Sequence, residues 1–325
     1  EHFRGGALLR MMDSRNREID YLRLSVTDRC NMRCVYCMPP SGVRLVSHHD
    51  ILSVEETIRL AGIITRALGI RKVRITGGEP LVRKGVTEIV RGISRSGVEE
   101  LVLTTNGILL GGMAEELSGA GIRRVNVSLD SLRDERIGRI TRSGATLSDI
   151  ESGIRRAADA GMTPVKVNCV VIRGWNDDET VDFLRWGRDM GLTVRFIEHM
   201  PSMLPAESFV PRDEILERAS ALGIVHRMET EGETAGRYRI GDSDMVFGIV
   251  APHSDDICRT CRRIRLSAEG VLYPCLSRSA GTPLRDLLRS GSYDERISET
   301  VRETVLRKPE GHGGCFQTEM WKVGG

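Results

Sequence analysis

The sequence predicts an α/β fold built on a parallel β-sheet, because short β-rich runs alternate with longer helical patterns between residues 20 and 200. The six strand candidates are Tyr21–Thr27, Lys72–Thr76, Glu100–Asn106, Arg124–Asp130, Pro164–Arg173 and Thr193–Met200. Six strand–helix units in series imply a parallel sheet, which is either open and wound on both faces or curled into an incomplete barrel. Periodicity alone does not separate these two architectures.

Segments with apolar residues at helical spacing lie between most of these strands. The clearest begins at Ser53, because Glu56 follows three residues later and the pair forms a capping-box signature. The predicted helices are Ser53–Leu68, Gly85–Ser96, Met113–Ala120, Leu147–Ala160 and Thr180–Met190.

Unusual polar and sulfur-containing residues follow the predicted strands. They are Cys30, Cys34 and Cys37 after the first, Gly77-Gly78-Glu79-Pro80 after the second, Thr104-Thr105-Asn106-Gly107 at the third, Ser128-Leu129-Asp130 at the fourth, Lys166 and Asn168 in the fifth, and Glu198-His199-Met200 at the sixth. The carboxyl ends of parallel strands in a barrel face one mouth, where catalytic loops gather. We therefore expect these residues to converge.

The alternation of strand and helix patterns ends after Met200, where several prolines follow. A predicted helix (Arg212–Leu222) and a β-rich segment (Gly236–Val250) come next. We therefore predict three parts. Residues 1–18 are polar and unpatterned and form a mobile leader, residues 19–204 form the strand–helix domain, and residues 205–325 form a C-terminal extension packed on its mouth.

Composition narrows the classes of partner. The 325 residues carry 47 basic and 45 acidic side chains, for a formal net charge of +2, and only 4% aromatic residues. This balance argues against a broad nucleic-acid surface. No apolar stretch is long enough to span a membrane, and no N-terminal segment reads as a signal peptide. We expect a cytoplasmic protein.

Cys30, Cys34 and Cys37 form the most informative motif, because three thiolates in eight residues can hold three irons of a four-iron, four-sulfur cluster. Such clusters normally have four cysteine ligands, so one iron is left for a small molecule. A structural zinc site normally shows four ligands in paired short spacings. Iron–sulfur is therefore the favoured interpretation.

Cys258, Cys261 and Cys275 form a second group of three cysteines. Two incomplete sets suggest two clusters, each with an open iron. Structural zinc remains an alternative for the second set, because Cys315 or His253 could supply a fourth ligand. Cys169 lies in an apolar strand and is most simply a buried small hydrophobe.

Basic residues alternate on strands that are otherwise destined for the core. Arg23 lies in the first strand, Lys72 and Arg74 share a face of the second, and Arg263 and Arg265 share a face beside the second cysteine set. A single charged residue usually lies on the solvated surface. Buried cations, by contrast, need partners, and guanidinium groups match phosphate geometry. We infer a polyphosphate or similarly anionic substrate between the two clusters.

These motifs carry a family resemblance. The spacing of Cys30, Cys34 and Cys37, followed by Gly-Gly-Glu-Pro, resembles the radical S-adenosylmethionine superfamily. The stretches Arg23–Cys30, Arg74–Pro80, Leu103–Gly107 and Asn126–Ser131, the second cysteine set with Arg263-Ile-Arg265, and the terminal Gly324-Gly325 resemble its GTP 3',8-cyclase family. That likeness runs from about residue 18 to the last residue.

The resemblance implies a fold and a role for each matching residue. The implied fold is an incomplete (βα)6 TIM-like barrel whose C-terminal α+β extension covers the mouth. Cys30, Cys34 and Cys37 would bind one 4Fe-4S cluster, and Cys258, Cys261 and Cys275 a second. S-adenosylmethionine would lie against Tyr36, Gly78, Glu79, Ser128 and Met200. GTP would contact Arg23, Lys72, Arg74, Thr105, Lys166, Arg263 and Arg265, and Gly324 and Gly325 would reach the active site.

The implied reaction is the first step of molybdenum cofactor biosynthesis. A 5'-deoxyadenosyl radical removes the ribose 3'-hydrogen of GTP, and the carbon radical adds to guanine C8 to give 3',8-cyclo-7,8-dihydro-GTP. Implied partners are a one-electron donor such as flavodoxin or ferredoxin, the downstream cyclic pyranopterin monophosphate synthase, and a second copy of the chain in a homodimer. One departure is Arg262, where the family commonly has asparagine.

Two other function classes compete with this interpretation. A radical S-adenosylmethionine peptide maturase with an auxiliary cluster would usually carry a longer C-terminal cysteine series. A zinc-stabilised binding module would contain zinc without iron or sulfide. Substrate binding and metal content distinguish the three.

Overall fold

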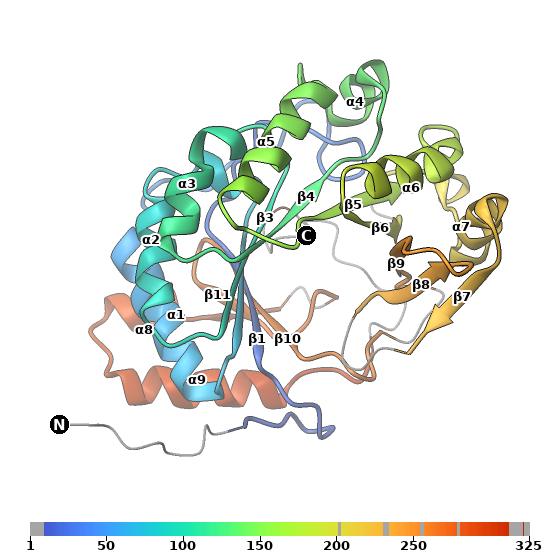
Figure 1. The fold of residues 1–325 in the computed structure, drawn as a ribbon. Coiled ribbons are helices and arrows are strands. Elements are labelled where there is room, and N and C mark those ends of the chain that lie inside the picture. Colours follow the sequence, from blue (N-terminus) through green and yellow to red (C-terminus); the bar gives the residue numbers. More distant parts are fainter. Residues whose placement is uncertain are drawn as a thin grey trace.

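The computed structural model describes residues 10–200, 203–229, 234–253, 257–277, 280–311 and 321. It is built around one mixed sheet with helices along its outer side (Figure 1). The six predicted strands are confirmed, each ending within two residues of the expected bounds. They are β1 (Tyr21–Ser25), β2 (Lys72–Thr76), β3 (Glu100–Thr105), β4 (Arg124–Ser128), β5 (Lys166–Val171) and β6 (Thr193–Glu198).

The predicted helices are also present between these strands, as α1 (Val54–Leu68), α2 (Val86–Ser94), α3 (Leu110–Ala120), α5 (Leu147–Asp159) and α6 (Thr180–Asp189). At the start of α1, the capping box between Ser53 and Glu56 forms in both directions. Helix α4 (Asp134–Thr141) was not predicted. It is short and polar, and its N-cap residue Arg133 provides no side-chain cap, so the sequence signals for a helix are weak there.

The C-terminal third contributes strands to the same sheet. Its elements are α7 (Arg212–Ala219), β7 (Val225–Met228), β8 (Gly236–Ile240), β9 (Val246–Val250), β10 (Arg263–Leu266), β11 (Val271–Tyr273), β12 (Thr282–Pro283), α8 (Arg285–Arg289) and α9 (Asp294–Leu306). Strand β9 pairs parallel to β6, and β10 pairs parallel to β1. The complete order is β12-β11-β10-β1-β2-β3-β4-β5-β6-β9-β8-β7. The first strand therefore lies inside the sheet and not at its edge.

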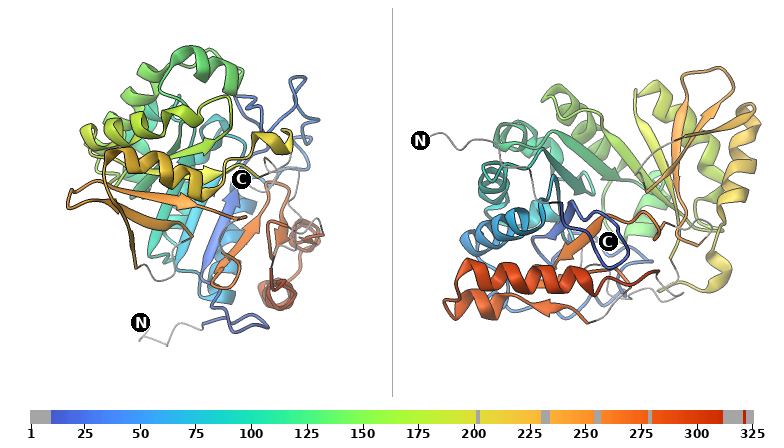
Figure 2. Two further views of the ribbon diagram at one scale, coloured as in Figure 1. Left: turned by 90° about the vertical axis from the view of Figure 1, so that its right-hand side faces the viewer. Right: turned by 90° about the horizontal axis from the view of Figure 1, so that it is seen from below.

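Alternate residues of each parallel strand face opposite sides. Leu22, Leu24, Val73 and Ile75 are fully buried in the apolar core. The residues between them are polar or charged and line an internal cavity. The helices cover the apolar side, and Figure 2 shows α9 alongside α1. The sheet thus separates an apolar layer from a polar interior.

The N-terminal segment is anchored where the structure describes it, at residues 10–18. Met12 and Glu18 form an isolated antiparallel bridge. Arg17 is only 7% exposed, and its guanidinium binds Asp13 and backbone oxygens near the other end of the chain. We predicted a mobile leader over residues 1–18, but residues 13–17 are held by these bonds. The division at residues 18 and 204 stays a prediction.

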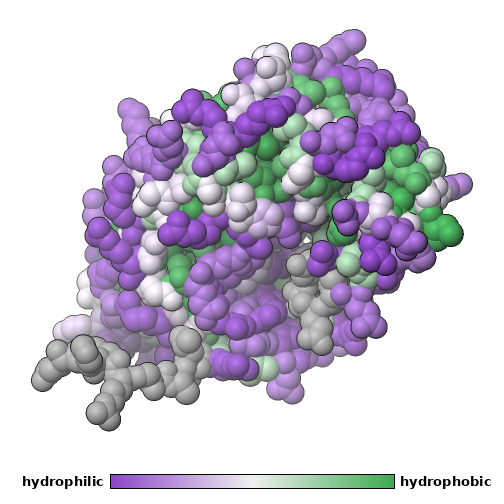
Figure 3. Space-filling model, viewed as in Figure 1, coloured by the Kyte–Doolittle hydropathy of each residue, from purple (hydrophilic) through white to green (hydrophobic). Residues whose placement is uncertain are grey.

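Hydrophilic residues cover most of the face that Figure 3 shows, with smaller hydrophobic areas between them. Within the described part of the chain, no helix is both long enough and apolar enough to cross a lipid bilayer.

Candidate active site

A single cavity of about 670 Å³ collects almost every residue that the sequence singled out. Both cysteine sets line it. So do the predicted co-substrate and nucleotide contacts: Tyr36, Gly78, Glu79, Ser128, Met200, Arg23, Lys72, Arg74, Thr105, Lys166, Arg263 and Arg265. Gly324, Gly325 and Cys315 lie outside the described residues. The expected convergence is therefore confirmed for the residues that line the cavity, whereas Glu198 and His199 at the end of β6 do not line it.

The strand register explains how the basic residues meet. Arg23 of β1 is paired with Arg74 of β2 on one side and with Arg265 of β10 on the other. Two residues earlier in β1, Tyr21 is paired with Lys72 of β2 and with Arg263 of β10. Side chains at the same level of a parallel sheet point the same way, so the three strands present two adjoining rows of cations to the cavity.

The two cysteine sets lie on opposite sides of these rows, beyond the two ends of the strands. Cys30 follows the carboxyl end of β1, whereas Cys261 precedes the amino end of β10, which runs parallel to β1 and in register with it. The cationic side chains thus occupy the strands between the two sets. This arrangement supports the inference of an anionic ligand between them.

The cations oppose one another electrostatically. Burial and the neighbouring charge of Arg265 lower the pKa of Arg23 well below its usual range. Burial and Arg263 likewise lower the pKa of Arg265 to about 10. A bound polyphosphate would relieve this repulsion, because it brings negative charge to the group.

Tyr21 lies within this cationic group and was not predicted as a site residue. Its hydroxyl accepts a short hydrogen bond from Arg74 Nε, and Lys72 Nζ lies 5.3 Å from the centroid of its ring. Burial would raise the pKa of Tyr21, but the charges of Arg74, Arg23 and Lys72 outweigh it and lower that pKa to about 7. The phenol oxygen is therefore placed where it can offset part of the positive charge of these cations.

Two further polar residues of the cavity, Asn126 and Arg195, were not predicted as site residues. Asn126 is paired with Lys166, and Asn168 with Arg195, so β4, β5 and β6 continue the polar wall. Arg195 alternates inward with the buried Val194 and Phe196 on either side. The same period-two pattern that marked Arg23 and Arg74 could have found it.

Cys30, Cys34 and Cys37 are unpaired thiols on one loop. Burial raises the pKa of Cys30 to about 11 and that of Cys37 to about 12, and it raises the pKa of Cys34 as well. All three line the same cavity, and a hydrogen bond from Cys37 N to Cys34 O (2.9 Å) turns the chain between the last two. Such a group favours soft metal ions, which take up thiolates and release the protons. The three residues therefore fit an iron–sulfur cluster.

The Gly77-Gly78 pair is required by the path of this loop. Backbone amides of Gly78 and Glu79 donate to the carbonyl oxygens of Thr27 and Arg29, at 2.8 Å each. A Cβ atom on Gly78 would lie 2.5 Å from Arg29 O, and one on Gly77 would lie 2.7 Å from Thr27 O. Only glycine lets the end of β2 run this close to the chain that enters Cys30.

Glu79 holds neighbouring loops together. Its side chain is 1% exposed and accepts hydrogen bonds from Thr105 Oγ1 (2.7 Å), Asn106 N (2.7 Å) and Leu81 N (3.0 Å). Burial, opposed by these bonds, raises the pKa of Glu79 to about 7. The hydroxyl of Thr105 is thus already engaged by Glu79. Direct contacts of Glu79 and Thr105 with ligands stay predictions.

Tyr36 is fixed from the end of β4. Its hydroxyl donates to Asp130 Oδ2 (2.7 Å), and Asp130 Oδ1 accepts from Val170 N (2.8 Å). Burial raises the pKa of Asp130 to about 6. Asp130 thus joins the cysteine loop to β5, next to the predicted co-substrate contact Ser128.

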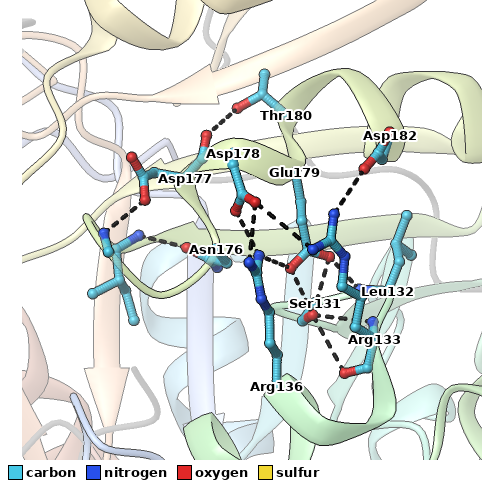
Figure 4. A network of polar contacts seen from close by, with 12 residues as sticks. Ser131, Leu132, Arg133, Arg136, Asn176, Asp177, Asp178, Glu179, Thr180 and Asp182 are labelled. Carbon is cyan, nitrogen blue, oxygen red and sulfur yellow. Dashed lines mark hydrogen bonds and ion pairs between the residues drawn. The ribbon is translucent and has the colours of Figure 1, made fainter.

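A network of polar contacts between residues 131–136 and 176–182 supports the loop that carries Asp130 (Figure 4). The carboxylate of Glu179 is fully buried and accepts from Ser131 Oγ (2.8 Å), Leu132 N (2.7 Å) and Arg136 Nη1 (2.8 Å). Asn176 Nδ2 donates to Asp130 O (2.6 Å). These bonds connect the loop after β4 to the loop after β5. Nothing in the sequence pattern pointed to Glu179, which lies in an acidic run that resembles exposed surface.

The second cysteine set lies at the other end of the cavity. Burial would raise the pKa of Cys261, but the charges of Arg263 and Lys308 outweigh it and lower that pKa to about 6. Cys275 Sγ lies 3.1 Å from Ser277 Oγ. Within the ranges that the structure describes, no three His, Cys, Asp or Glu side chains converge enough to hold a single metal ion. That finding bears on single-ion sites such as zinc, and not on a cluster whose thiolates bind separate irons.

Arg262, which departs from the family pattern, has structural partners. It forms ion pairs with Asp20 and with Glu18, the latter at 3.5 Å. Asp20 also pairs with Arg71 at 2.6 Å. Arg262 therefore fastens the chain before β10 to the chain before β1, where the two strands begin to pair.

Comparison with known proteins agrees with this site. Residues 24–187 match the family model for the radical SAM superfamily, and residues 192–314 match the model named Molybdenum Cofactor Synthesis C. The chain is 44% identical to GTP 3',8-cyclase of Pelotomaculum thermopropionicum, covering 97% of this chain and 100% of that one. The corresponding enzyme of Geobacter sulfurreducens is 45% identical, with 94% of each chain covered. That of Thermodesulfovibrio yellowstonii is 43% identical, covering 93% and 95%.

Solved structures support the fold. SuiB of Streptococcus suis matches with a TM-score of 0.63 at 13% identity, covering 93% of this chain and 74% of that one. Its S-adenosylmethionine-bound form matches with a TM-score of 0.58 at 14% identity and the same coverage.

The two matched regions adjoin and together carry both cysteine sets, and the curated relatives are similar over nearly their whole length. The chain belongs to the GTP 3',8-cyclase family of radical S-adenosylmethionine enzymes.

Proposed function

We propose that this chain converts GTP to 3',8-cyclo-7,8-dihydro-GTP at the cavity between its two cysteine sets. The observation that carries the proposal is the order of groups along the strands. One cysteine set lies at the carboxyl end, the other lies at the amino end, and the cations lie between them. Membership of the family supplies the reaction, and this order supports binding of the nucleotide between the two cysteine sets.

The sheet is proposed to be the wall of an incomplete (βα)6 barrel, with residues 205–325 as an extension that closes its mouth. The parallel run from β1 to β6 supports this reading, as does the polar interior face. Strands β9 and β10 would then extend the wall beyond six strands.

Cys30, Cys34 and Cys37 are proposed to hold the family's 4Fe-4S cluster, with S-adenosylmethionine on the remaining iron. Tyr36, Gly78, Glu79, Ser128 and Met200 would surround that co-substrate. Tyr36 is held by Asp130, and Gly78 leaves its backbone uncovered by a side chain. These residues give the co-substrate a rigid wall, which favours one orientation.

Cys258, Cys261 and Cys275 are proposed to hold a second cluster beside the guanine base. The triphosphate would lie against Arg23, Lys72, Arg74, Thr105, Lys166, Arg263 and Arg265, with Arg195 as a further contact. Arg74 and Arg265 are 7% and 5% exposed, and Arg23 is paired with both of them, so the phosphates would be held away from bulk water. Charge-assisted bonds are stronger in such surroundings.

When bound, the first cluster supplies the electron that splits S-adenosylmethionine, and the resulting 5'-deoxyadenosyl radical takes the ribose 3'-hydrogen so that this carbon joins guanine C8. The protein's share is orientation. The paired arginines fix the phosphates, and Tyr36 and Asp130 fix the wall on the co-substrate side.

The family context leads to further expectations. We propose a one-electron donor of the flavodoxin or ferredoxin kind, delivery of product to a cyclic pyranopterin monophosphate synthase, and a cytoplasmic setting with a possible homodimer. Gly324 and Gly325 are proposed to reach the active site. Adding one residue after Gly325 should then reduce turnover far more than it lowers the melting temperature.

The direct test is anaerobic incubation of the reconstituted protein with GTP, S-adenosylmethionine and dithionite. Mass analysis should detect 5'-deoxyadenosine and a dihydro-GTP isomer in comparable amounts. Omitting GTP, or supplying a cysteine-containing peptide in its place, should leave only slow uncoupled formation of 5'-deoxyadenosine. Cleavage of S-adenosylmethionine with no GTP-derived product would reject the proposed substrate.

A further inference from the structure

A compact group of buried cations lies behind the second cysteine set and is not accounted for by the proposed reaction. It joins the N-terminal segment, the chain after α9 and the backbone that carries the cysteines. Arg17 and Lys308 are its central members, at 7% and 4% exposure. Long charged side chains are rarely buried to this extent unless they bind specific partners.

Arg17 links three distant segments. Its Nε donates to Asp13 Oδ2 at 2.6 Å, and Asp13 Oδ1 in turn accepts from Arg15 N and Arg17 N at 2.9 Å each. The other end of the guanidinium donates to Cys258 O (2.9 Å), Glu310 O (3.0 Å) and Pro309 O (2.6 Å). The planar guanidinium therefore holds the backbone of one cysteine in a fixed place.

Lys308 binds the other side of the cysteine set. Its Nζ donates to Arg263 O (2.6 Å) and to Pro274 O (2.7 Å). Pro274 immediately precedes Cys275, and Arg263 begins β10 two residues after Cys261. One ammonium group thus connects the backbone beside two cysteines, and Arg17 holds the third.

The positive charge of Lys308 also acts on the second cysteine set. Among the residues that the structure describes, Lys308 makes no ion pair with a carboxylate, and the charges that act on it favourably are those of Cys261 and Cys275. Arg17, by contrast, is balanced by Asp13. A buried ammonium requires a compensating anion, and a cluster held by three thiolates carries net negative charge.

We propose that Arg17 and Lys308 are positioning residues that fix the second cysteine set for its cluster, and that Lys308 also sets the reduction potential of that cluster. The N-terminal segment from Asp13 to Arg17 is then part of the scaffold of the active site. The inference rests on the proposed second cluster. Outer groups that orient metal ligands typically change metal affinity by about 10- to 100-fold when removed.

The experiment uses a full-length parent in which Cys30, Cys34 and Cys37 are all alanine, so that only the second cluster is observed. Arg17→Ala, Lys308→Met and Lys308→Gln are compared in this parent after anaerobic reconstitution. Iron and sulfide per chain, the electron paramagnetic resonance of the reduced cluster and its reduction potential are measured. Arg15→Ala is the matched control, because Arg15 belongs to the same segment but forms an exposed ion pair with Glu310 at 2.8 Å.

Arg17→Ala should weaken cluster retention by about 10-fold or more, within the range for such outer partners. Lys308→Gln keeps donor N–H groups without the charge, so it should retain iron but lower the reduction potential, because a positive charge stabilises the reduced state. Lys308→Met removes both the donor groups and the charge, so it should retain less iron and also lower the reduction potential of the cluster that remains. Arg15→Ala should match the parent in every measurement.

The failures of the two proposals are distinguishable. A parent that takes up no iron and sulfide would refute the second cluster itself. A parent with a normal cluster, and Arg17→Ala and Lys308→Gln variants indistinguishable from Arg15→Ala in iron content and potential, would refute the positioning role. Thermal melting of each variant identifies any that fails to fold. In that case Lys308→Gln, which makes the smallest change in shape, decides the matter.

Discussion

At the scale of single residues, the site is governed by the balance of buried charge. Arg23, Arg74 and Arg265 approach one another on adjacent strands, and the fold places the hydroxyl of Tyr21 among them as an acceptor for Arg74. The sequence predicted the cations, because they alternate with apolar residues on strands. It did not predict Tyr21, since an aromatic residue at the start of a strand is normally read as core packing.

Tyr21 should titrate near neutral pH. With its pKa lowered to about 7 from the usual 10, the phenolate is favoured by folding, so this group adds stability as pH rises from about 7 toward 10 and loses it as pH falls through 7. A pH titration of tyrosinate absorbance on cluster-free protein should show one early transition that Tyr21→Phe lacks. Saturating GTP should shift that transition to higher pH, because the phosphates compete for the same cations. A transition unaffected by Tyr21→Phe would contradict the assignment.

Asp130→Ala should weaken binding of S-adenosylmethionine without removing a direct ligand contact. The change leaves Tyr36 Oη and Val170 N without their acceptor, which costs on the order of 1–3 kcal/mol of folding free energy. Asp130→Asn is the matched control, because it keeps one acceptor oxygen for Val170 N and its amide NH2 can donate to Tyr36 Oη. Calorimetric titration and chemical denaturation measure the two effects. Equal co-substrate affinity in both variants would show that Asp130 does not act through Tyr36.

At the scale of secondary-structure elements, the loops after the strands could be placed from sequence because glycine and polar residues interrupt strong apolar patterns. The bounds of β1 to β6 and of α1 followed from these signals. Helix α4 did not, because its apolar residues are too few to define a face. The hydrogen-bonded role of Glu79 was hidden as well, since Gly-Gly-Glu-Pro does not reveal that the carboxylate turns toward Asn106.

Gly78→Ala should disturb the first cysteine loop selectively. Its Cβ would approach Arg29 O to 2.5 Å, so the loop entering Cys30 must move. We expect loss of first-cluster iron and of S-adenosylmethionine cleavage. Gly112→Ala in α3 is the control, because its Cβ meets nothing within 4 Å, and it should be neutral or stabilising by about 0.5–1 kcal/mol. Iron analysis of both proteins provides the measurement, and normal iron content in Gly78→Ala would show that the loop tolerates a side chain there.

At the scale of the whole molecule, the two cysteine sets could be recognised from sequence and an anionic substrate was predicted between them, but the strand pairing that sets them apart could not be predicted. That geometry depends on β10 pairing with β1, and Asp20 and Arg262 just before those strands are 242 positions apart. Local patterns carry no information about such pairing. The same holds for Arg17, whose burial depends on Cys258 and Pro309.

The two ends of the cavity should fail differently. Cys34→Ala should abolish cleavage of S-adenosylmethionine while leaving iron at the second set and GTP binding intact. Cys261→Ala should retain uncoupled cleavage but lose the GTP product. Arg265→Ala should keep both clusters and weaken GTP binding by roughly 1.5–3 kcal/mol, as for a lost bond to a charged group. Iron content, 5'-deoxyadenosine yield and equilibrium dialysis with GTP distinguish the three, and unchanged GTP affinity would remove Arg265 from the site.

The interior position of β1 has a consequence for how the protein is made. During synthesis β1 leaves the ribosome early, yet its neighbour β10 belongs to the last fifth of the chain. Until then one edge of β1 has no partner, and an open edge invites misplaced strand pairing. A cluster inserted into the nascent chain would lie beside an incomplete sheet that still lacks β10. We therefore expect assembly factors to load metal only after translation has ended.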